Sequence, residues 1–383
     1  MKKNGRFIIT FLLIFSLLIG GTPLLQAKAA SNKKEEKATF ELTMLDVGQG
    51  LSILIKADGK YMLYDGGDRD TSSYVVSYLK KHSSMDFEYI FASHYHSDHI
   101  AGLVGVLNTS KAKKVVCPDY SSNTKIYKSF TEMLKKNGAK VVHPKAGNKY
   151  ELGEADITVL HVDNKAEDEN NRSIAIRIDY GKTSVIITGD CEADAELEMV
   201  NSKYDLEADV LVAGHHGSTS SNTAKFLEAV EPSYVLISSG EGNSYGHPTS
   251  DTLDNIKKAE AEIYRTDTQN EVTLYSDGKS YWFSEEPTDN WKPGEKEVFK
   301  NTATQTYTNS NKDTNTKAKV DKSTKGTADE KNCTYVLNTN TKKIHLHGCS
   351  SVNTMKDKNK GYTNKTIEQL MKEGYEPCKR CKP

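Results

Sequence analysis

The residues best suited to chemistry lie in one short stretch, residues 93–99, which reads Ser-His-Tyr-His-Ser-Asp-His. Imidazole and carboxylate groups are the ligands that Zn²⁺ and Mn²⁺ select. His94 and His96 are two positions apart at the end of an expected strand, so their side chains can point the same way. Asp98 and His99 lie on the turn that follows and can reach a second point nearby. The spacing therefore predicts two divalent metal ions that share one water molecule.

Two elements must hold this stretch in place. Residues 89–92 before it are apolar and predict a buried strand, and residues 100–104 after it predict the start of a helix. The alternative is a polar loop with chance histidines. The chain has 11 histidines and three of them fall in this stretch, which favours the metal site.

The surrounding chain alternates between strands and helices from residue 40 to residue 283. Residues 114–117 predict a strand that is followed by a helix over 125–136, and residues 184–188 predict a strand that is followed by a helix over 192–201. Such alternation is typical of the α/β class, in which helices and sheets form layers.

Seven motifs in this region resemble those of the metallo-β-lactamase-fold hydrolases. They are residues 45–50, 63–67, 93–99, 185–190, 210–218, 245–248 and 264–267. Within that superfamily, the combination is most similar to the soluble hydrolase domain of ComEC-type DNA-uptake proteins. The resemblance implies a four-layer αββα sandwich with its site at the edge where the strands end.

The resemblance also implies which residues bind the two ions. All are histidines or aspartates: His94 and His96 for the first ion, Asp98 and His99 for the second, and Asp190 as a bridge. Either His215 or His216 completes the second site, while its neighbour orients the substrate or a ligand. Of these two we favour His215 as the ligand. The metal is zinc or manganese.

One segment departs from the superfamily pattern. Many members place another histidine on the first metal, whereas this chain has Glu-Asn-Asn-Arg-Ser at residues 169–173. The open position would be filled by water, by Asn171, or only when substrate binds. His161 is an alternative, although it more simply ends an expected strand over residues 156–161.

The expected mechanism is metal-assisted hydrolysis. Two cations about 3.5–4 Å apart hold a bridging hydroxide, because they lower the pKa of the parent water toward about 7. They also polarise the electrophile and stabilise the developing oxyanion. Asp98 or Asp190 accepts the proton. His247 donates to the leaving group or binds a phosphate oxygen, unless it is only a surface histidine before the turn at Pro248.

Three further residues are assigned around the metals. The hydroxyl of Ser218 suits a phosphodiester substrate, and Arg265 either contacts phosphate or forms a structural ion pair. Asp65 is expected to accept a hydrogen bond from a metal-bound histidine and so orient it.

The N-terminus predicts a signal peptide over residues 1–29 and hence secretion. Lys2, Lys3 and Arg6 are followed by an apolar run over residues 7–19 and by Ala-Lys-Ala at residues 27–29. An uncleaved anchor is the alternative. We expect a disordered lead over residues 30–38, a hydrolase domain over 39–285 and a flexible polar linker over 286–331, which has few large apolar residues.

The last segment, residues 332–383, predicts a small α+β module stapled by zinc. Its expected ligands are His345, Cys349, Cys378 and Cys381, whose spacing suits a tetrahedral site. The pattern resembles the N-terminal zinc domain of Ada-type DNA repair proteins. His347 in place of His345, or a disulfide of Cys378 with Cys349 or with Cys381, are the alternatives. So short a segment needs the metal for much of its folding free energy.

The substrate is the least determined feature. The net charge is −1, so bulk charge gives no argument for nucleic-acid binding. The resemblance favours a secreted phosphodiesterase or nuclease acting on DNA. The first alternative is a cell-envelope phosphodiesterase similar to the phosphorylcholine esterases of teichoic acids. A lactam or lactone hydrolase is less favoured, because those enzymes usually carry the histidine that is absent here.

Overall fold

The computed structural model describes residues 38–294, 335–346, 352, 355–363, 365 and 367–378. The expected signal peptide and nearly all of the expected lead lie outside these residues, as do residues 295–331 of the expected linker. The chain divides into two compact units between Asn301 and Thr302. Each unit is considered by itself.

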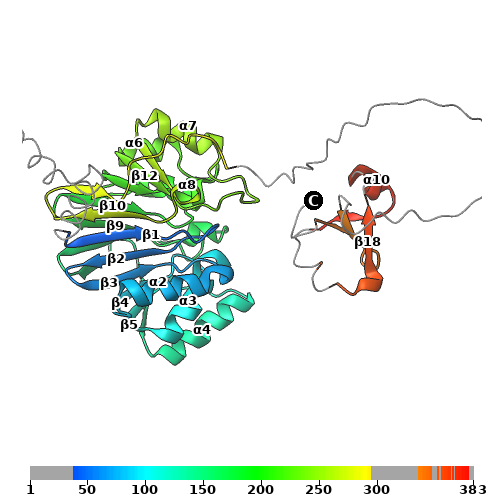
Figure 1. The fold of residues 1–383 in the computed structure, drawn as a ribbon, viewed down its shortest axis with the longest axis horizontal. Helices are drawn as coiled ribbons and strands as arrows, with labels where there is room; N and C mark the ends of the chain where they lie inside the picture. The colour runs from blue at the N-terminus through cyan, green and yellow to red at the C-terminus, as the bar shows by residue number, and fades with distance from the viewer. Residues whose placement is uncertain are drawn as a thin grey trace, which may run out of the picture. The chain divides into compact units, whose positions relative to one another are not determined.

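The first sheet of the first unit has eight strands, and its last four are parallel. In spatial order they are β15 (Tyr281–Phe283), β14 (Val272–Ser276), β1 (Phe40–Met44), β2 (Ile53–Ala57), β3 (Lys60–Tyr64), β4 (Asp86–Phe91), β5 (Lys111–Val116) and β6 (Lys140–Val142). Its outer face is covered by α2 (Ser72–His82), α3 (Ser97–Thr109) and α4 (Lys125–Asn137), with η1 (Arg69–Thr71) leading into α2 (Figure 1).

The second sheet has seven strands. In spatial order they are β13 (Glu262–Arg265), β12 (Tyr234–Ile237), β11 (Val210–Val212), β10 (Thr183–Ile187), β9 (Ala175–Tyr180), β8 (Ala155–His161) and β7 (Lys149–Leu152). Its outer face packs on α5 (Ala193–Val200), α6 (Ala224–Val230) and α7 (Ser250–Lys258). The short elements η2 (Asn170–Arg172), η3 (Gly214–Gly217) and α8 (Thr266–Gln269) complete this half.

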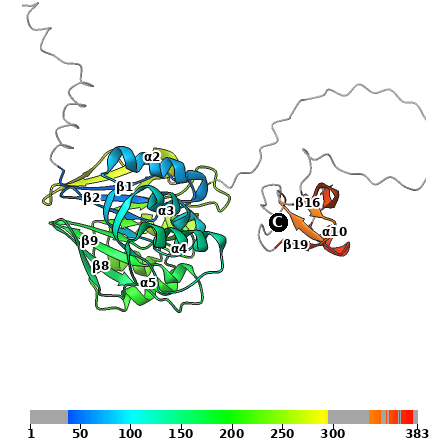
Figure 2. The same cartoon turned by 90° about the horizontal axis from the view of Figure 1, so that it is seen from below.

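Three apolar layers separate these elements. The largest lies between the two sheets, where Phe40 and Ile55 of the first sheet pack with Ile176 and Ile187 of the second, all 0% exposed. The other two lie between each sheet and its own helices (Figure 2). Alternate strand residues thus face different apolar layers, as two buried sheet faces require. The α/β class and the four-layer αββα sandwich are confirmed.

Local signals explain where the expected helices begin and end. The helix expected at 125–136 is α4, which begins after Thr124, whose hydroxyl accepts the Tyr127 N–H. It ends at Gly138, whose φ of 76° is a left-handed conformation that glycine adopts readily. The helix expected at 192–201 is α5, and the strand expected at 184–188 is β10, one residue earlier at each end.

The packed first unit continues beyond residue 285, where the hydrolase domain was expected to end. The Thr288 N–H donates to the Ile263 carbonyl at 2.9 Å, and the Gly294 N–H donates to the Pro248 carbonyl at 2.8 Å. Trp291 packs against the apolar layer beneath α6 and α7. These backbone contacts extend the ordered unit at least to Gly294. The polar composition of the segment gives no sign of them.

The second unit contains a four-stranded sheet in the order β18 (Lys360–Thr363), β16 (Tyr335–Asn338), β17 (Lys343–His345) and β19 (Glu376–Pro377). The turn η4 (Asp357–Asn359) precedes β18, and the helix α10 (Ile367–Lys372) lies between β18 and β19 in the sequence. The buried residues His345 and Cys378 come close because the Cys378 N–H donates to the Ile344 carbonyl. Cys349 and Cys381 lie outside the described residues, so the zinc site stays a prediction.

No helix within the described ranges is both long and apolar enough to cross a membrane.

Candidate metal centre

The candidate site forms where strands of both sheets end at one edge. Asp65 directly follows β3, and His94 lies three residues after the end of β4, its parallel neighbour. Asp190 follows β10, and His216 follows β11, which are also parallel neighbours. Parallel strands bring their carboxyl ends to the same edge, so four segments far apart in sequence meet there.

Two glycines let the helix that carries His99 approach the first sheet closely. The Gly66 N–H donates to the His99 carbonyl at 2.8 Å, and the Gly102 N–H donates to the Gly67 carbonyl at 2.9 Å. A Cβ atom on Gly102 would lie 1.7 Å from the Gly66 carbonyl oxygen. This backbone contact places the first turn of α3, and with it His99, against the end of β3.

The histidines and aspartates gather into two groups that share Asp190. One group contains Asp98, His99, Asp190 and His216, and the other contains His94, His96 and Asp190; within each group the ligand atoms lie within 4.8 Å of one another. Four buried ligand atoms, His94 Nε2, His99 Nε2, His216 Nε2 and Asp190 Oδ1, form no well-aligned hydrogen bond with the described residues, although His99 Nε2 lies 3.1 Å from Asp190 Oδ1. Leaving such atoms buried and unsatisfied costs about 1–3 kcal/mol each. The donor set therefore fits a pair of divalent cations.

Asp65 holds His99 in a fixed orientation. Its Oδ2 lies 2.7 Å from His99 Nδ1, and its two oxygens accept the Ser93 N–H at 2.8 Å and the Ser93 hydroxyl at 2.7 Å. Asp65 and His99 are both 0% exposed. Burial raises the pKa of Asp65, while His99 and Ser93 oppose that rise. With Nδ1 held by Asp65, the ring presents Nε2 to the cluster.

The other two buried histidines are oriented in the same way. His94 Nδ1 lies 3.0 Å from the Ser93 hydroxyl and 3.2 Å from the Ser173 hydroxyl. His216 Nδ1 lies 3.1 Å from the Ser238 carbonyl oxygen. In each ring one nitrogen is held by the protein and Nε2 faces the cluster. The roles of Ser93 and Ser173 could not be predicted from sequence, because a serine beside a ligand carries no distinctive signal.

In the metal-free protein, burial and the neighbouring charges shift the pKa values of the three buried histidines in different directions. Burial lowers the pKa of His94, and the neighbouring His99 lowers it further. Burial also disfavours charged His216 and His99, but Asp190 outweighs it, raising the pKa of His216 to about 9 and that of His99 well above its usual value. The protons that Asp190 holds on these two rings would leave when cations bind, because a ligating imidazole nitrogen must be deprotonated.

The structure distinguishes the two adjacent histidines on which the second site depends. Of the two groups found in the described part of the chain, one contains His216 and neither contains His215. His215 Nδ1 lies 3.2 Å from the Ser220 hydroxyl, and its side chain is 23% exposed. Both residues have left-handed backbones, with φ of 50° for His215 and 57° for His216. The geometry therefore favours His216 over His215, the ligand favoured from sequence.

The departure at residues 169–173 is also explained by local contacts. The side-chain oxygen of Asn171 accepts the Glu192 N–H at 2.8 Å, so it braces the loop that follows Asp190. His161 Nε2 lies 3.1 Å from Glu198 Oε2, and its other nitrogen contacts a backbone carbonyl. Both side chains are thus engaged elsewhere, and neither is a member of the two ligand groups in the described residues.

His247 lies beside the cluster rather than on the surface. It is 7% exposed, and its ring centroid lies 5.7 Å from that of His215 and 6.5 Å from that of His216. Its Nδ1 lies 3.3 Å from Gln49 Nε2. Tyr245 stacks on His247 at 5.5 Å and is 63% exposed. An exposed aromatic ring therefore borders the cluster.

Arg265 does not face the site, and its expected phosphate contact is not supported. Its guanidinium is 2% exposed and pairs with both carboxylate oxygens of Asp267, at 3.0 and 2.7 Å. It also donates to the carbonyl of Asn290 at 2.7 Å. The structural alternative explains this residue, because its charge is already paired inside the fold. Ser218 is buried, and its hydroxyl lies 3.0 Å from that of Ser220, which in turn contacts His215.

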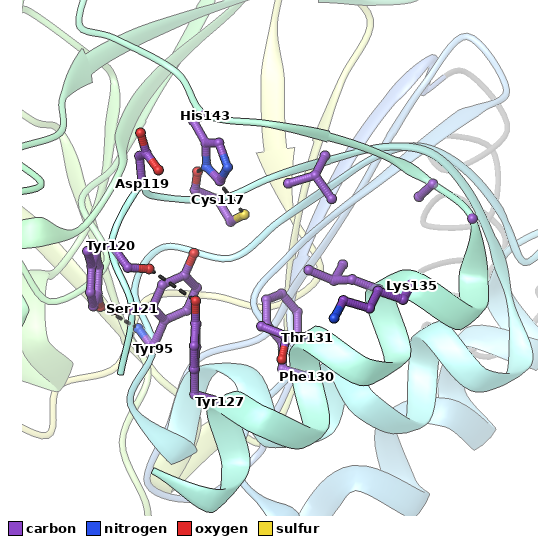
Figure 3. A pocket seen from close by; sticks show the side chains of 14 residues that line it. Tyr95, Cys117, Asp119, Tyr120, Ser121, Tyr127, Phe130, Thr131, Lys135 and His143 are labelled. Atoms are coloured by element: carbon purple, nitrogen blue, oxygen red, sulfur yellow. Dashed lines mark hydrogen bonds between the residues drawn. The ribbon is translucent and has the colours of Figure 1, made fainter. Parts of the chain in front are cut away.

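A cavity of 640 Å³ lies behind the ligand motif and was not foreseen from sequence (Figure 3). Its walls include Tyr95, which stands between His94 and His96, together with Tyr120 and Tyr127. The ring centroids of Tyr120 and Tyr127 lie 4.5 and 4.7 Å from that of Tyr95. The aromatic cluster gives the backbone of the motif a rigid support.

Comparisons with known proteins identify a family and several relatives of this chain. The profile of the Metallo-beta-lactamase superfamily matches residues 45–241. The chain is 27% identical over 256 residues to ComE operon protein 3 of Bacillus subtilis (strain 168), covering 61% of this chain and 33% of that protein. It is 30% identical over 230 residues to Competence protein ComA of Neisseria gonorrhoeae, covering 59% of this chain and 31% of that protein. The matched region thus spans about a third of these relatives.

Among solved structures, the chain is similar to the metallo-beta-lactamase fold protein YhfI of Bacillus subtilis. The identity is 14% and the TM-score is 0.42, with 64% of this chain and 99% of that chain covered.

Proposed function

Because the chain belongs to the metallo-beta-lactamase superfamily, and is thus a metal-dependent hydrolase, we propose that it is a dimetal phosphodiesterase whose substrate is DNA. The observation that carries this proposal is the set of buried Nε2 atoms of His94, His99 and His216. They converge on Asp190, whose oxygens lie 3.1–3.9 Å away, and they form no well-aligned hydrogen bond with the described residues.

The proposed ligands are those of the two groups, with His216 in place of His215. When bound, a pair of zinc or manganese ions supplies a water of lowered pKa and a positive field for a phosphoryl oxygen. Asp98 is the group placed to take up a proton, since its side chain is 29% exposed. Burial disfavours its charged form, yet His99 and His216 hold its pKa below the usual range, so Asp98 is a carboxylate that accepts a hydrogen bond from the water and is a weak base toward it.

Three side chains beside the cluster are suited to a phosphodiester. His215, 23% exposed, can donate a hydrogen bond to a phosphate oxygen, and the hydroxyls of Ser218 and Ser220 lie beside it. His247 stands behind His215 and is placed to donate to a leaving oxygen. Asn171 stabilises the loop that follows Asp190 through its bond to the Glu192 N–H, and Asp65 orients the His99 ring.

DNA is favoured over other phosphodiesters by two observations. Tyr245 presents a largely exposed ring next to the cluster, and aromatic rings stack on unpaired bases. The matched relatives carry the names Competence protein ComA and, at 28% identity, Recombination protein 2 of Haemophilus influenzae, which refer to DNA uptake and exchange.

The proposal includes secretion and a separate structural zinc site in the C-terminal unit. The basic start, apolar run and Ala-Lys-Ala sequence within residues 1–29 support export, which would bring the enzyme to extracellular DNA. A structural zinc on His345, Cys349, Cys378 and Cys381 is supported by the ligand spacing and by the proximity of Cys378 to His345.

The test is cleavage of DNA by the purified chain from residue 30 to residue 383. Linear and circular DNA are incubated with Mn²⁺ or Zn²⁺, beside Asp98→Ala and the control Asp254→Ala, whose side chain is exposed on α7. We expect cleavage by the parent and the control, and a loss of about 10²–10⁴-fold in Asp98→Ala.

Two outcomes would redirect the proposal. If a metal-loaded protein leaves DNA intact but hydrolyses bis(p-nitrophenyl) phosphate, the substrate is another phosphodiester, and release of phosphorylcholine from teichoic acid is measured next. If it opens a chromogenic lactam and no phosphodiester, the phosphodiesterase assignment is abandoned.

A further inference from the structure

His96 differs from the other proposed ligands in how it is supported. The rings of His94, His99 and His216 are buried, and each has one nitrogen within hydrogen-bond distance of a serine, an aspartate or a carbonyl. The His96 side chain is 41% exposed, and its Nε2 lies 3.7 Å from Oε2 of Glu169. Glu169 is therefore the carboxylate that faces this ring.

Glu169 is itself held in position by Tyr120. The Tyr120 hydroxyl donates to Glu169 Oε1 at 2.9 Å and accepts the Tyr95 N–H at 2.9 Å. Figure 3 shows the second of these bonds, with Tyr120 at the wall of the cavity. Arg172 lies over the Tyr120 ring at 4.7 Å. One hydroxyl thus connects Glu169 to the backbone between His94 and His96.

The segment that carries Glu169 is also tied to the loop after Asp190. Asn170 Nδ2 donates to Glu192 Oε1 at 3.1 Å, and the Asn171 side-chain oxygen accepts the Glu192 N–H at 2.8 Å. The turn at 169–172 therefore connects the loop that carries His94 and His96 with the loop that carries Asp190. Its polar residues form the hydrogen bonds that make this connection.

We infer that Glu169 is a positioning residue for His96, held for that role by Tyr120. A carboxylate facing Nε2 keeps the proton on that nitrogen and leaves the lone pair on Nδ1, the tautomer that can ligate a cation through Nδ1. The separation of 3.7 Å exceeds a hydrogen bond, and the His96 side chain, which is 41% exposed, can shorten it by a small rotation while Glu169 stays on the Tyr120 hydroxyl. Glu169 would then act on His96 as Asp65 acts on His99.

This inference rests on the proposed metal site and does not depend on DNA as the substrate. The test compares Glu169→Gln with the control Glu167→Gln, an exposed residue in the same loop that carries the same charge. Zn²⁺ and Mn²⁺ binding is followed by titration calorimetry, and the His96 tautomer of the zinc form by long-range ¹H–¹⁵N NMR.

We expect one of the two ions to bind about 10–100-fold more weakly in Glu169→Gln, because the loss of a carboxylate behind a ligating histidine has that effect. The other ion, and the melting temperature in chelator, should match the parent, and Glu167→Gln should bind both ions normally. Tyr120→Phe should reduce the affinity for the same ion to a smaller extent. In the parent, His96 should carry its proton on Nε2.

Equal affinities in Glu169→Gln and the parent would overturn the inference, and so would a metal-bound crystal structure with a Glu169 oxygen on the ion. A parent protein that binds no metal would overturn both this inference and the proposed function. A parent that binds two ions but does not cleave DNA would remove only the choice of substrate.

Discussion

The contact between Asp65 and His99 allows a sharp test of the second metal site through Asp65→Asn. The wild-type carboxylate accepts from His99 Nδ1 and from two donors of Ser93, all between 2.7 and 2.8 Å. An asparagine has one acceptor oxygen and an amide that only donates. If its oxygen stays with Ser93, its amide faces His99 Nδ1, which must then accept. The His99 proton moves to Nε2, the nitrogen that faces Asp190 at 3.1 Å, and the ring can no longer ligate.

The size of the effect follows from this change of tautomer. The loss of a carboxylate behind a ligating histidine weakens metal binding by about 10–100-fold, or about 1.4–2.7 kcal/mol. The metal-free protein should also lose about 1.5–3 kcal/mol of its free energy of unfolding, because a charged hydrogen bond is removed from a site that is 0% exposed.

Both quantities can be measured on one pair of variants. Calorimetric titration with Zn²⁺ gives the affinity, and urea unfolding in EDTA gives the stability without metal. Asp254→Asn, an exposed change of the same kind on α7, is the control. The reasoning is refuted if Asp65→Asn binds both ions with the affinity of the parent, since His99 would then ligate without its partner.

The remaining predictions concern metal removal and close packing. With free metal at about 100 times its Kd, each bound ion stabilises the fold by about 2.7 kcal/mol, so removal of two ions by EDTA should lower the Tm by about 11–22 °C. The shift should largely vanish in Asp190→Ala, and an equal shift there would place the stabilising ions elsewhere. Gly102→Ala should destabilise the protein by at least about 3 kcal/mol in urea unfolding, because its Cβ would lie 1.7 Å from a backbone oxygen. In Gly105→Ala the new Cβ would meet two side-chain atoms, the Ser72 hydroxyl at 2.6 Å and a Val76 methyl at 3.3 Å, and no backbone atom, so the loss should be smaller; similar losses in both variants would contradict the packing argument.

Much of the fold was predictable because its layers impose a repeating pattern. The helix at α4 and the strand at β10 were placed within one residue, since amphipathic spacing and buried runs record which side faces an apolar layer. The ligand motif was predictable for a different reason. His94, His96 and Asp98 are grouped by the chain itself, so their proximity needs no knowledge of the fold.

Contacts between distant segments could not be predicted in the same way. The choice between His215 and His216 depends on two successive left-handed residues, a backbone conformation that the sequence does not reveal. Arg265 is paired by Asp267 and by a segment that composition assigned to a linker. The part played by Ser173 depends on the approach of two sheets, which becomes visible only when both are folded.

The division of the ligands between the sheets has a consequence for how the molecule opens. His94 and His99 come from the first sheet, whereas Asp190 and His216 come from the second. Asp190 belongs to both ligand groups, so each bound cation would link the first sheet to the second. The halves could not separate at this edge without releasing both cations together. Metal binding would then slow the separation of the two sheets. The exchange rate of the bound ions and the rate of this opening would therefore report the same event.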